Sequence, residues 1–173
     1  MPLVIVSGGQ SGVDRAALDA ALASGFEVAG WCPAGRWAED GPIDARYPLR
    51  ETATADPAER TRRNVAESDA LLVLAPAAVA GGTALAVAEA QRLGRPVFVA
   101  DPSGDPGEAL AWLARERPSR LNIAGPRESE APGVYGDALR WLGTALATIR
   151  STARPSEPPR SGSRPPGRRG SPG

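Results

Sequence analysis

Short apolar runs alternate with amphipathic segments along the first 150 residues, and this alternation restricts the possible folds more than any other feature. Each run is bounded by Gly, Pro or charge, as strands usually are. They predict strands over Leu3–Ser7, Glu27–Trp31, Ala70–Ala75, Pro96–Ala100 and Arg120–Ala124. The segments between and after them predict helices over Gly12–Ser24, Pro57–Glu67, Thr83–Leu93, Gly107–Glu116 and Gly133–Arg150. Because strands that alternate with helices pair in parallel, we expect an α/β fold, with about five mainly parallel strands and helices on both faces of the sheet.

The first strand-to-helix junction is rich in glycine. The sequence VIVSGGQSGVDRAALDAAL, residues 4–22, passes from an apolar run through three glycines into the first amphipathic helix. Glycine permits positive φ and lacks the Cβ that would block a ligand, and the N-terminus of a helix attracts anions. Ligands of parallel α/β sheets bind where such loops leave the strands. The junction therefore predicts a phosphate or other anion held by Ser7, Gly8, Gly9, Gln10, Ser11 and Gly12; the alternative is a tight turn in which Asp14 only favours the helix dipole.

Two later strand ends repeat the arrangement. Gly81, Gly82 and Thr83 follow the third predicted strand, where Thr83 is a favourable N-cap, and the alternative is capping alone. Gly125 and Arg127 follow the last predicted strand. Arg127 is suited to clamp an anion, and a solvated loop charge is the alternative.

The loop CPAGRWAEDGPIDARYPLRETATAD, residues 32–56, is too long for a simple connection, and loops of this length are usually functional or disordered. Its aromatic side chains predict that it packs. Glu39 and Asp40 are adjacent carboxylates that suit a hard cation, a ribose hydroxyl or acid–base chemistry, although neighbours in an extended loop point apart, which favours a structural role. Cys32 is expected to be a small buried hydrophobe rather than a metal ligand.

The composition excludes several kinds of chemistry. The 173 residues contain no histidine and one cysteine, which removes Ser/His and Cys/His catalytic pairs and any internal disulfide. The chain begins without the basic region of a signal peptide, and no apolar run approaches the roughly 20 residues that cross a membrane. We therefore expect a cytoplasmic protein with no membrane partner.

Charge is divided unevenly between two regions. Residues 151–173 hold five arginines against one glutamate, a charge of +4, which leaves −4 for residues 1–150 because the whole chain is neutral. The acidic body argues against a nucleic-acid partner. We expect one domain over residues 1–150 and a disordered Pro-, Arg-, Ser- and Gly-rich tail over residues 151–173.

Five ordered blocks of the sequence resemble the molybdenum carrier family, also described as circularly permuted YpsA-like proteins. The blocks are SGGQSGVDRAALDAAL, GWCPAGRWAEDGPI…YPL, ERTRRNVAESDALLVL, GGTAL and LNIAGPRESEAPGVY. The resemblance implies a Rossmann-like three-layer domain of the SLOG superfamily that forms homo-oligomers, dimers or tetramers, and binds a nucleotide or related ligand. Some relatives are described as carriers of the molybdenum cofactor (molybdopterin), a phosphorylated pterin that they hold without turnover.

Two other families share parts of the sequence. ERTRRNVAESDALLVL…GGTALAVAEA resembles the Lonely Guy phosphoribohydrolases, which carry an arginine where Arg60 stands. Those enzymes place glutamates just after the loop threonine, whereas here the nearest acid is Glu89, almost two helical turns along. The first block also resembles DNA-processing proteins that load recombinase, which bind nucleic acid through basic surfaces.

The sequence thus predicts a cytoplasmic binding or carrier protein for a small phosphorylated heterocycle, either the molybdenum cofactor or a nucleotide. A nucleotide N-glycosidase and a nucleotide-sensing SLOG protein are the alternatives. The candidate charge partners of the ligand are Arg15, Arg36, Arg60 and Arg127, and the candidate partners of its ring or ribose are Asp14, Glu39 and Asp40. No catalytic residue and no metal ligand is assigned.

Overall fold

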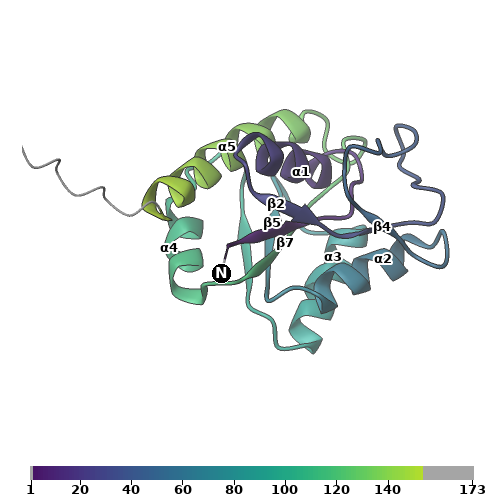
Figure 1. Ribbon diagram of the computed structural model, residues 1–173, viewed down its shortest axis with the longest axis horizontal. Helices are drawn as coiled ribbons and strands as arrows, with labels where there is room; N and C mark the ends of the chain where they lie inside the picture. Colours follow the sequence, from purple (N-terminus) through teal and green to yellow (C-terminus); the bar gives the residue numbers. More distant parts are fainter. Residues whose placement is uncertain (1, 154–173) are drawn as a thin grey trace, which may run out of the picture.

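The computed structural model describes residues 2–153 (Figure 1). These residues form seven strands and five helices in the order β1 (Val4–Val6), α1 (Val13–Ala23), β2 (Glu27–Ala29), β3 (Trp31–Cys32), β4 (Arg50–Glu51), α2 (Pro57–Ala66), β5 (Ala70–Leu74), α3 (Gly81–Arg92), β6 (Val97–Ala100), α4 (Gly107–Glu116), β7 (Arg120–Ala124) and α5 (Val134–Ala153). The predicted tail lies outside the described residues from position 154 onward. Its first three residues, 151–153, belong to α5, so the helix continues past the predicted domain end.

Five strands form one parallel sheet in the order β2-β1-β7-β5-β6. Ile5 lies opposite Val28 and Leu121, which fixes the register on the β1 side. All five residues of β5 are buried, as expected for a parallel strand that is covered on both faces. The predicted α/β fold with a five-stranded parallel sheet is confirmed.

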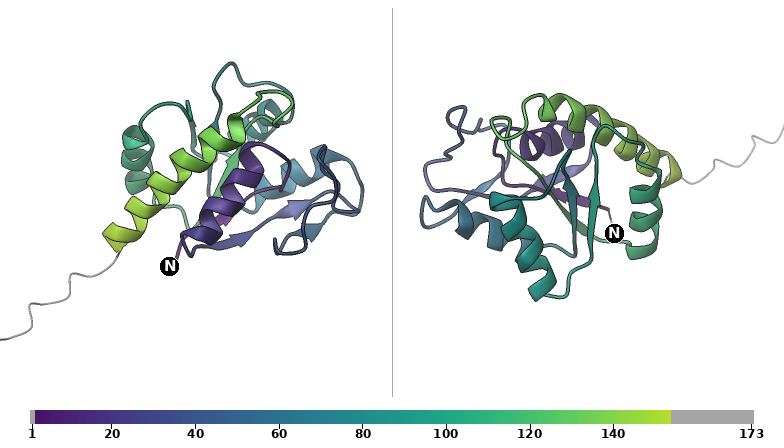
Figure 2. Two further views of the ribbon diagram at one scale, coloured as in Figure 1. Left: turned by 90° about the horizontal axis from the view of Figure 1, so that it is seen from above. Right: turned by 180° about the vertical axis from the view of Figure 1, so that it is seen from behind.

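Helices cover both faces of the sheet and complete three layers (Figures 1 and 2). On one face α1 packs against α5, and α4 joins them in a core that includes Trp112 and Trp141. On the other face α2 packs against α3 over a smaller core that includes Val65, Leu71 and Val73.

The second predicted strand is divided at Gly30. This residue has φ +145°, and a Cβ there would collide with the carbonyl oxygen of Ser7. The chain turns away at this point, and β3 pairs in parallel with β4 from the long loop. The small sheet is fixed to α2 by Asn64, whose amide bonds both the N–H and the carbonyl of Trp31, at 2.7 and 3.0 Å.

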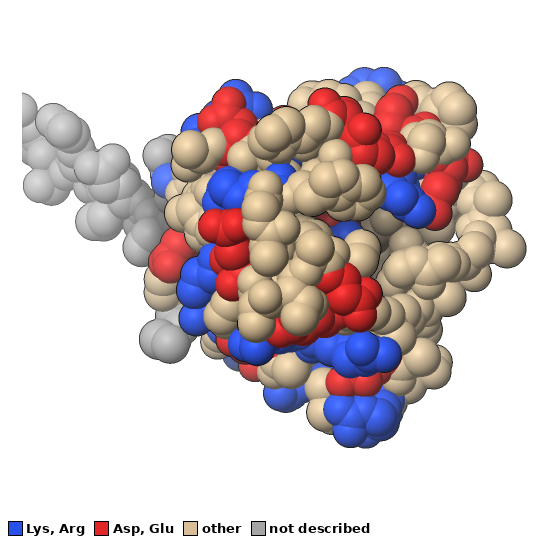
Figure 3. Space-filling view, turned by 90° about the vertical axis from the view of Figure 1, so that its right-hand side faces the viewer, with Lys and Arg blue, Asp and Glu red and all other residues tan. Residues whose placement is uncertain are grey.

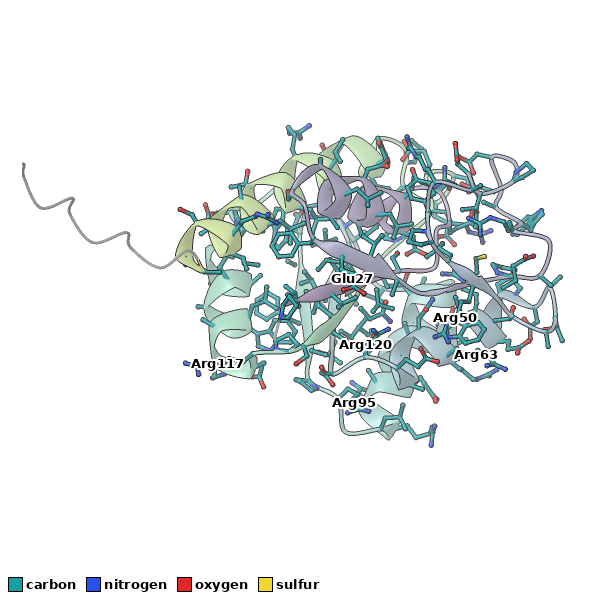
Figure 4. The ribbon with its side chains drawn as sticks, in the orientation of Figure 1. Glu27, Arg50, Arg63, Arg95, Arg117 and Arg120 are labelled. Atoms are coloured by element: carbon teal, nitrogen blue, oxygen red, sulfur yellow. The ribbon has the colours of Figure 1, made fainter. Side chains whose placement is uncertain are left out.

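Two arginines further secure this small sheet. The guanidinium carbons of Arg50 and Arg63 lie 4.0 and 4.6 Å from the ring centroid of Trp31, within the range of cation–π attraction. Figure 4 labels both arginines, close together beside β4 and α2. The 32–56 loop is thus packed against the domain, as its aromatic residues predicted.

The third helix begins earlier than predicted. Ala80 is its N-cap residue, in extended conformation, and Gly81 enters the helix with φ +53°, which glycine tolerates. Thr83 therefore lies in the first turn and makes no capping bond, so the prediction that it is the N-cap is wrong. Within residues 2–153, none of the helices combines the length and the apolarity that crossing a bilayer requires.

Candidate ligand-binding cleft

A cleft of about 290 Å³ opens where β1, β5 and β7 end. Its walls come from the β1–α1 junction, the end of β7 and the first turns of α2 and α3, with Trp37 of the long loop at one side. Figure 3 views this end of the molecule and shows a hollow surrounded by acidic and basic side chains. The position is the one expected for ligands of parallel α/β sheets.

A buried ion pair crosses the cleft from α2 to α1. Arg60 Nη1 lies 2.6 Å from Asp14 Oδ2, and the two side chains are only 15% and 5% exposed. Burial raises the pKa of Asp14, while the neighbouring Arg60 guanidinium partly opposes this rise. Arg60 Nε is buried and has no hydrogen-bond partner in the described part of the chain. The ion pair uses Nη1, and Nη2 makes no hydrogen bond to residues 2–153, so this nitrogen is free to bind an anion.

The glycines of the first junction make room mainly for protein groups. A Cβ on Gly8 would collide with the guanidinium of Arg60, and one on Gly9 would press against Leu49 of the long loop. A Cβ on Gly12 would collide with the carbonyl oxygen of Pro126 in the β7–α5 loop. These close approaches, rather than a ligand alone, account for the glycine pattern.

Part of the N-terminus of α1 is also closed by the protein. The N–H of Val13 donates to Pro126 O at 3.3 Å, and the N–H of Ser11 donates to Gln10 Oε1 at 3.0 Å. The carboxamide of Gln10 accepts a second N–H, from Glu39, at 2.9 Å. With its oxygen engaged twice, Gln10 has only its NH₂ group to offer the cleft.

The N-terminus of α3 is open. Gly81, Gly82 and Thr83 line the cleft, and their backbone N–H groups have no acceptor among residues 2–153. A Cβ on Gly82 would meet open space, and the Thr83 hydroxyl makes no hydrogen bond to the described residues. Free N–H groups at the positive end of a helix dipole attract an anion. This second glycine loop is therefore the better anion site of the two.

Asn122 is a cleft residue that the sequence analysis missed. It lies in β7 opposite Val6 and Leu71, is only 3% exposed, and its amide makes no hydrogen bond within the described residues. Because Asn122 lines the cleft, its amide is free to form a hydrogen bond with a ligand there. An asparagine within the apolar run RLNIA was the available signal, because asparagine is depleted in strands.

Glu130 was also missed, because nothing in its local sequence distinguishes it from other loop acids. Its Oε2 accepts the N–H of Arg127 at 2.9 Å, and its Oε1 lies 3.4 Å from the Arg127 guanidinium. The same Oε1 would be 3.4 Å from a Cβ on Gly81. A carboxylate thus stands beside the open N-terminus of α3, and Arg127 is already engaged with it.

The two carboxylates of the long loop diverge. Glu39 accepts hydrogen bonds from the Ser11 hydroxyl and from the N–H and hydroxyl of Ser129, the latter two at 3.1 and 2.5 Å. These bonds, led by that from Ser11, lower the pKa of Glu39. Asp40 instead pairs with Arg15 at 3.2 Å. This arrangement matches the structural alternative, in which neither carboxylate reaches the cleft.

Arg36 and Ser7 also bond within the protein. The guanidinium of Arg36 donates to four backbone carbonyls of the 32–56 loop, those of Ile43, Asp44, Tyr47 and Leu49. The Ser7 hydroxyl donates to Asp14 O at 3.1 Å. Cys32 is fully buried in the larger core. Glu89 pairs with Arg92 on α3 and does not line the cleft.

The structure therefore divides the predicted residues into two groups. Those that line the cleft are Gly8, Gln10, Asp14, Arg60, Gly81, Gly82, Thr83, Gly125 and Arg127. Those that lie outside its lining are Ser7, Gly9, Ser11, Gly12, Arg15, Arg36, Glu39 and Asp40.

The sequence model of the Circularly permutated YpsA SLOG family matches residues 5–146. The chain belongs to this family. A crystal structure from Syntrophus aciditrophicus, described as a "putative molybdenum carrier protein", is similar, with 36% sequence identity and a TM-score of 0.80. The match covers 84% of this chain and 96% of that one. The comparison with curated proteins finds no match.

In this SLOG family protein the cleft presents mainly hydrogen-bond donors. They are the N–H groups of α3, the Thr83 hydroxyl, the amides of Gln10 and Asn122 and the guanidinium of Arg60. Among residues 2–153 there is no group of three or more His, Cys, Asp or Glu side chains arranged to hold a metal ion. Such a donor set suits a ligand that carries acceptor atoms, such as an anion.

Proposed function

We propose that this protein binds a phosphorylated heterocycle, either the molybdenum cofactor or a nucleotide, in the cleft and holds it without chemical turnover. The observation that carries the proposal is that Asn122, a residue only 3% exposed whose amide makes no hydrogen bond within residues 2–153, lies in the same cleft as the open N-terminus of α3. The Asn122 amide supplies a hydrogen-bond partner for a ring edge, and the N-terminus of α3 attracts an anion. The carrier name of the similar crystal structure supports this choice of ligand.

Each end of the ligand has a candidate set of contacts. The phosphate would bind the N–H groups and hydroxyl at the start of α3, with the Arg60 guanidinium as its charge partner. The ring would meet the amides of Gln10 and Asn122. Trp37, which is half-exposed, offers a flat apolar surface for stacking. The molybdenum cofactor, when bound, would supply both the phosphate and the pterin ring.

Phosphoribohydrolase chemistry is the second candidate, because Arg60 and Glu130 line one cleft. Glu130 is a carboxylate that the glycine-loop sequence does not reveal, and a hydrolase needs one to stabilise a ribosyl cation. We further propose that the protein is cytoplasmic and forms a homo-oligomer.

The deciding experiment is native mass spectrometry with elemental analysis, on protein purified without air from a host that makes molybdenum cofactor. We expect a stoichiometric pterin-sized adduct with molybdenum. Asn122→Leu, which is nearly isosteric, should lose the adduct with little change in folding stability, because the Asn122 amide makes no hydrogen bond within the described residues. Asn122→Asp should lose it as well, because an added negative charge repels the ligand.

Other results would change the proposal. A nucleotide adduct without molybdenum would make the protein a nucleotide binder. Release of free base from added nucleoside 5′-monophosphates, abolished in Glu130→Gln, would replace the carrier with a hydrolase. Retention of the adduct in Asn122→Leu would place the ligand elsewhere.

A further inference from the structure

The sheet ends at β6, and the outer edge of this strand has no partner strand among residues 2–153. The N–H groups of Leu71 and Ala75 donate to the carbonyls of Pro96 and Ala100, each at 2.9 Å, so these two residues of the 96–100 segment face β5. Because successive residues of a strand direct their backbone groups to opposite sides, Val97 and Val99 direct theirs outward. Neither valine has an outer-edge partner within residues 2–153.

This edge lacks the features that usually prevent strands from associating. The sequence of β6 is VFVA, with no charge, and Val99 is 49% exposed. The opposite edge, β2, has only three residues, begins with Glu27 and is interrupted at Gly30. Charge and distortion protect an edge, and both are present in β2; β6, although it has only four residues and follows Pro96, has neither within the strand. Figure 2, right, views the molecule from behind, the side away from β2.

Charges flank the apolar segment in a self-complementary way. Arg95 precedes it, three residues after the end of α3, where its Nη2 lies 3.5 Å from Ala66 O, and exposed Asp101 follows it. Figure 4 labels Arg95 near the lower edge of the molecule. An antiparallel copy centred on Phe98 places Val97 opposite the Val99 of the other copy and Arg95 opposite its Asp101. A copy centred on Val97 instead places Arg95 opposite Val99, and a copy centred on Val99 places Asp101 opposite Val97.

We infer that β6 pairs antiparallel with β6 of a second copy of this chain, about a two-fold axis at Phe98. The pairing joins the two five-stranded sheets into one continuous sheet. It uses the outward backbone groups of both valines, covers Val99 and sets two Arg95–Asp101 charge pairs at its ends. The contact is isologous and closes at a dimer. It leaves the cleft open and does not depend on what the cleft binds.

The test is sedimentation velocity of the full chain over a range of concentrations. We expect a dimer whose fraction rises with concentration. Val99→Lys should weaken dimerisation at least tenfold and leave the circular dichroism spectrum unchanged. Leu22→Lys on α1, where the side chain is 42% exposed, is the matched control and should dimerise like the parent chain. A monomer at every concentration, or equal dimerisation of Val99→Lys and the parent, would overturn the inference.

Cross-linking tests the register independently of Val99→Lys. Paired residues in an antiparallel ladder have Cα atoms about 5.5 Å apart, which suits a disulfide. A mixture of Val97→Cys and Val99→Cys chains should form a covalent dimer under mild oxidation. Either variant alone should form little, because its own cysteines are not opposite each other. Self-cross-linking of Val99→Cys, or none in the mixture, would refute this register.

Discussion

Replacement of Arg60 by methionine tests the buried ion pair that crosses the cleft. The substitution keeps much of the apolar stem but leaves the Asp14 carboxylate, 5% exposed, without its cation. Removing one partner of a buried pair costs about 3–5 kcal/mol. Because the Arg60 side chain is still 15% exposed, we expect a loss at the lower end of this range, about 3 kcal/mol of unfolding free energy at pH 8.

The penalty should depend on pH in a defined direction. Burial already raises the pKa of Asp14 above its ordinary value, and loss of Arg60 removes the main opposing influence. With the folded pKa above the unfolded one, the folded state keeps a proton that the unfolded state has released. Unfolding free energy therefore falls as pH rises between the two pKa values, by about 1.4 kcal/mol per pH unit at most. In Arg60→Met the folded and unfolded pKa values of Asp14 lie further apart than in the parent chain. The loss of unfolding free energy relative to the parent should therefore be small near pH 4 and largest at pH 8.

Urea unfolding followed by tryptophan fluorescence at pH 5 and pH 8 measures this difference. Arg62→Met, two residues further along α2 on its exposed side, is the control and should change stability by less than about 0.5 kcal/mol. Arg60→Met combined with Asp14→Asn should recover part of the loss, because an amide needs no cation. A deficit that is equal at both pH values, or a double variant no more stable than Arg60→Met, would refute the reasoning.

Three further predictions concern single positions. Gly12→Ala should lower the unfolding free energy by more than about 2 kcal/mol in denaturant titration, because φ is +77° and the new Cβ would collide with Pro126. Gly82→Ala is the control and should not lower it, because a Cβ there meets open space. Equal losses of stability in the two variants would contradict this prediction. Glu130→Gln should bind inorganic phosphate about three- to tenfold more tightly by calorimetry, since it removes a negative charge beside the α3 N-terminus; unchanged affinity would place the anion elsewhere. Burial raises the pKa of Tyr135 to about 12. Unfolding free energy should therefore fall between pH 10 and pH 12, because the unfolded tyrosine ionises first, and Tyr135→Phe should show a shallower fall.

The order of strands and helices could be predicted because its signals are local. Apolar runs and helical periodicity are properties of neighbouring residues, so Gly107–Glu116 and Arg120–Ala124 were predicted with their observed bounds. The main errors arose where distant groups meet. The second strand is interrupted at Gly30, where the carbonyl of Ser7, just after the end of β1, closely approaches its backbone.

The sequence by itself determined a parallel α/β domain with glycine-rich loops at the ends of its strands, and this was enough to predict a candidate site at one edge of the sheet. Only the tertiary structure decided which loop is open. The two junctions look alike in sequence, yet Pro126 accepts the Val13 N–H of α1 while the first N–H groups of α3 have no acceptor within the described residues. Likewise, Asn122 and Glu130 became cleft residues only when β7 and its following loop were placed against the start of α3. Whether a polar group is free for a ligand depends on which remote groups reach it, and that is a property of packing rather than of local sequence.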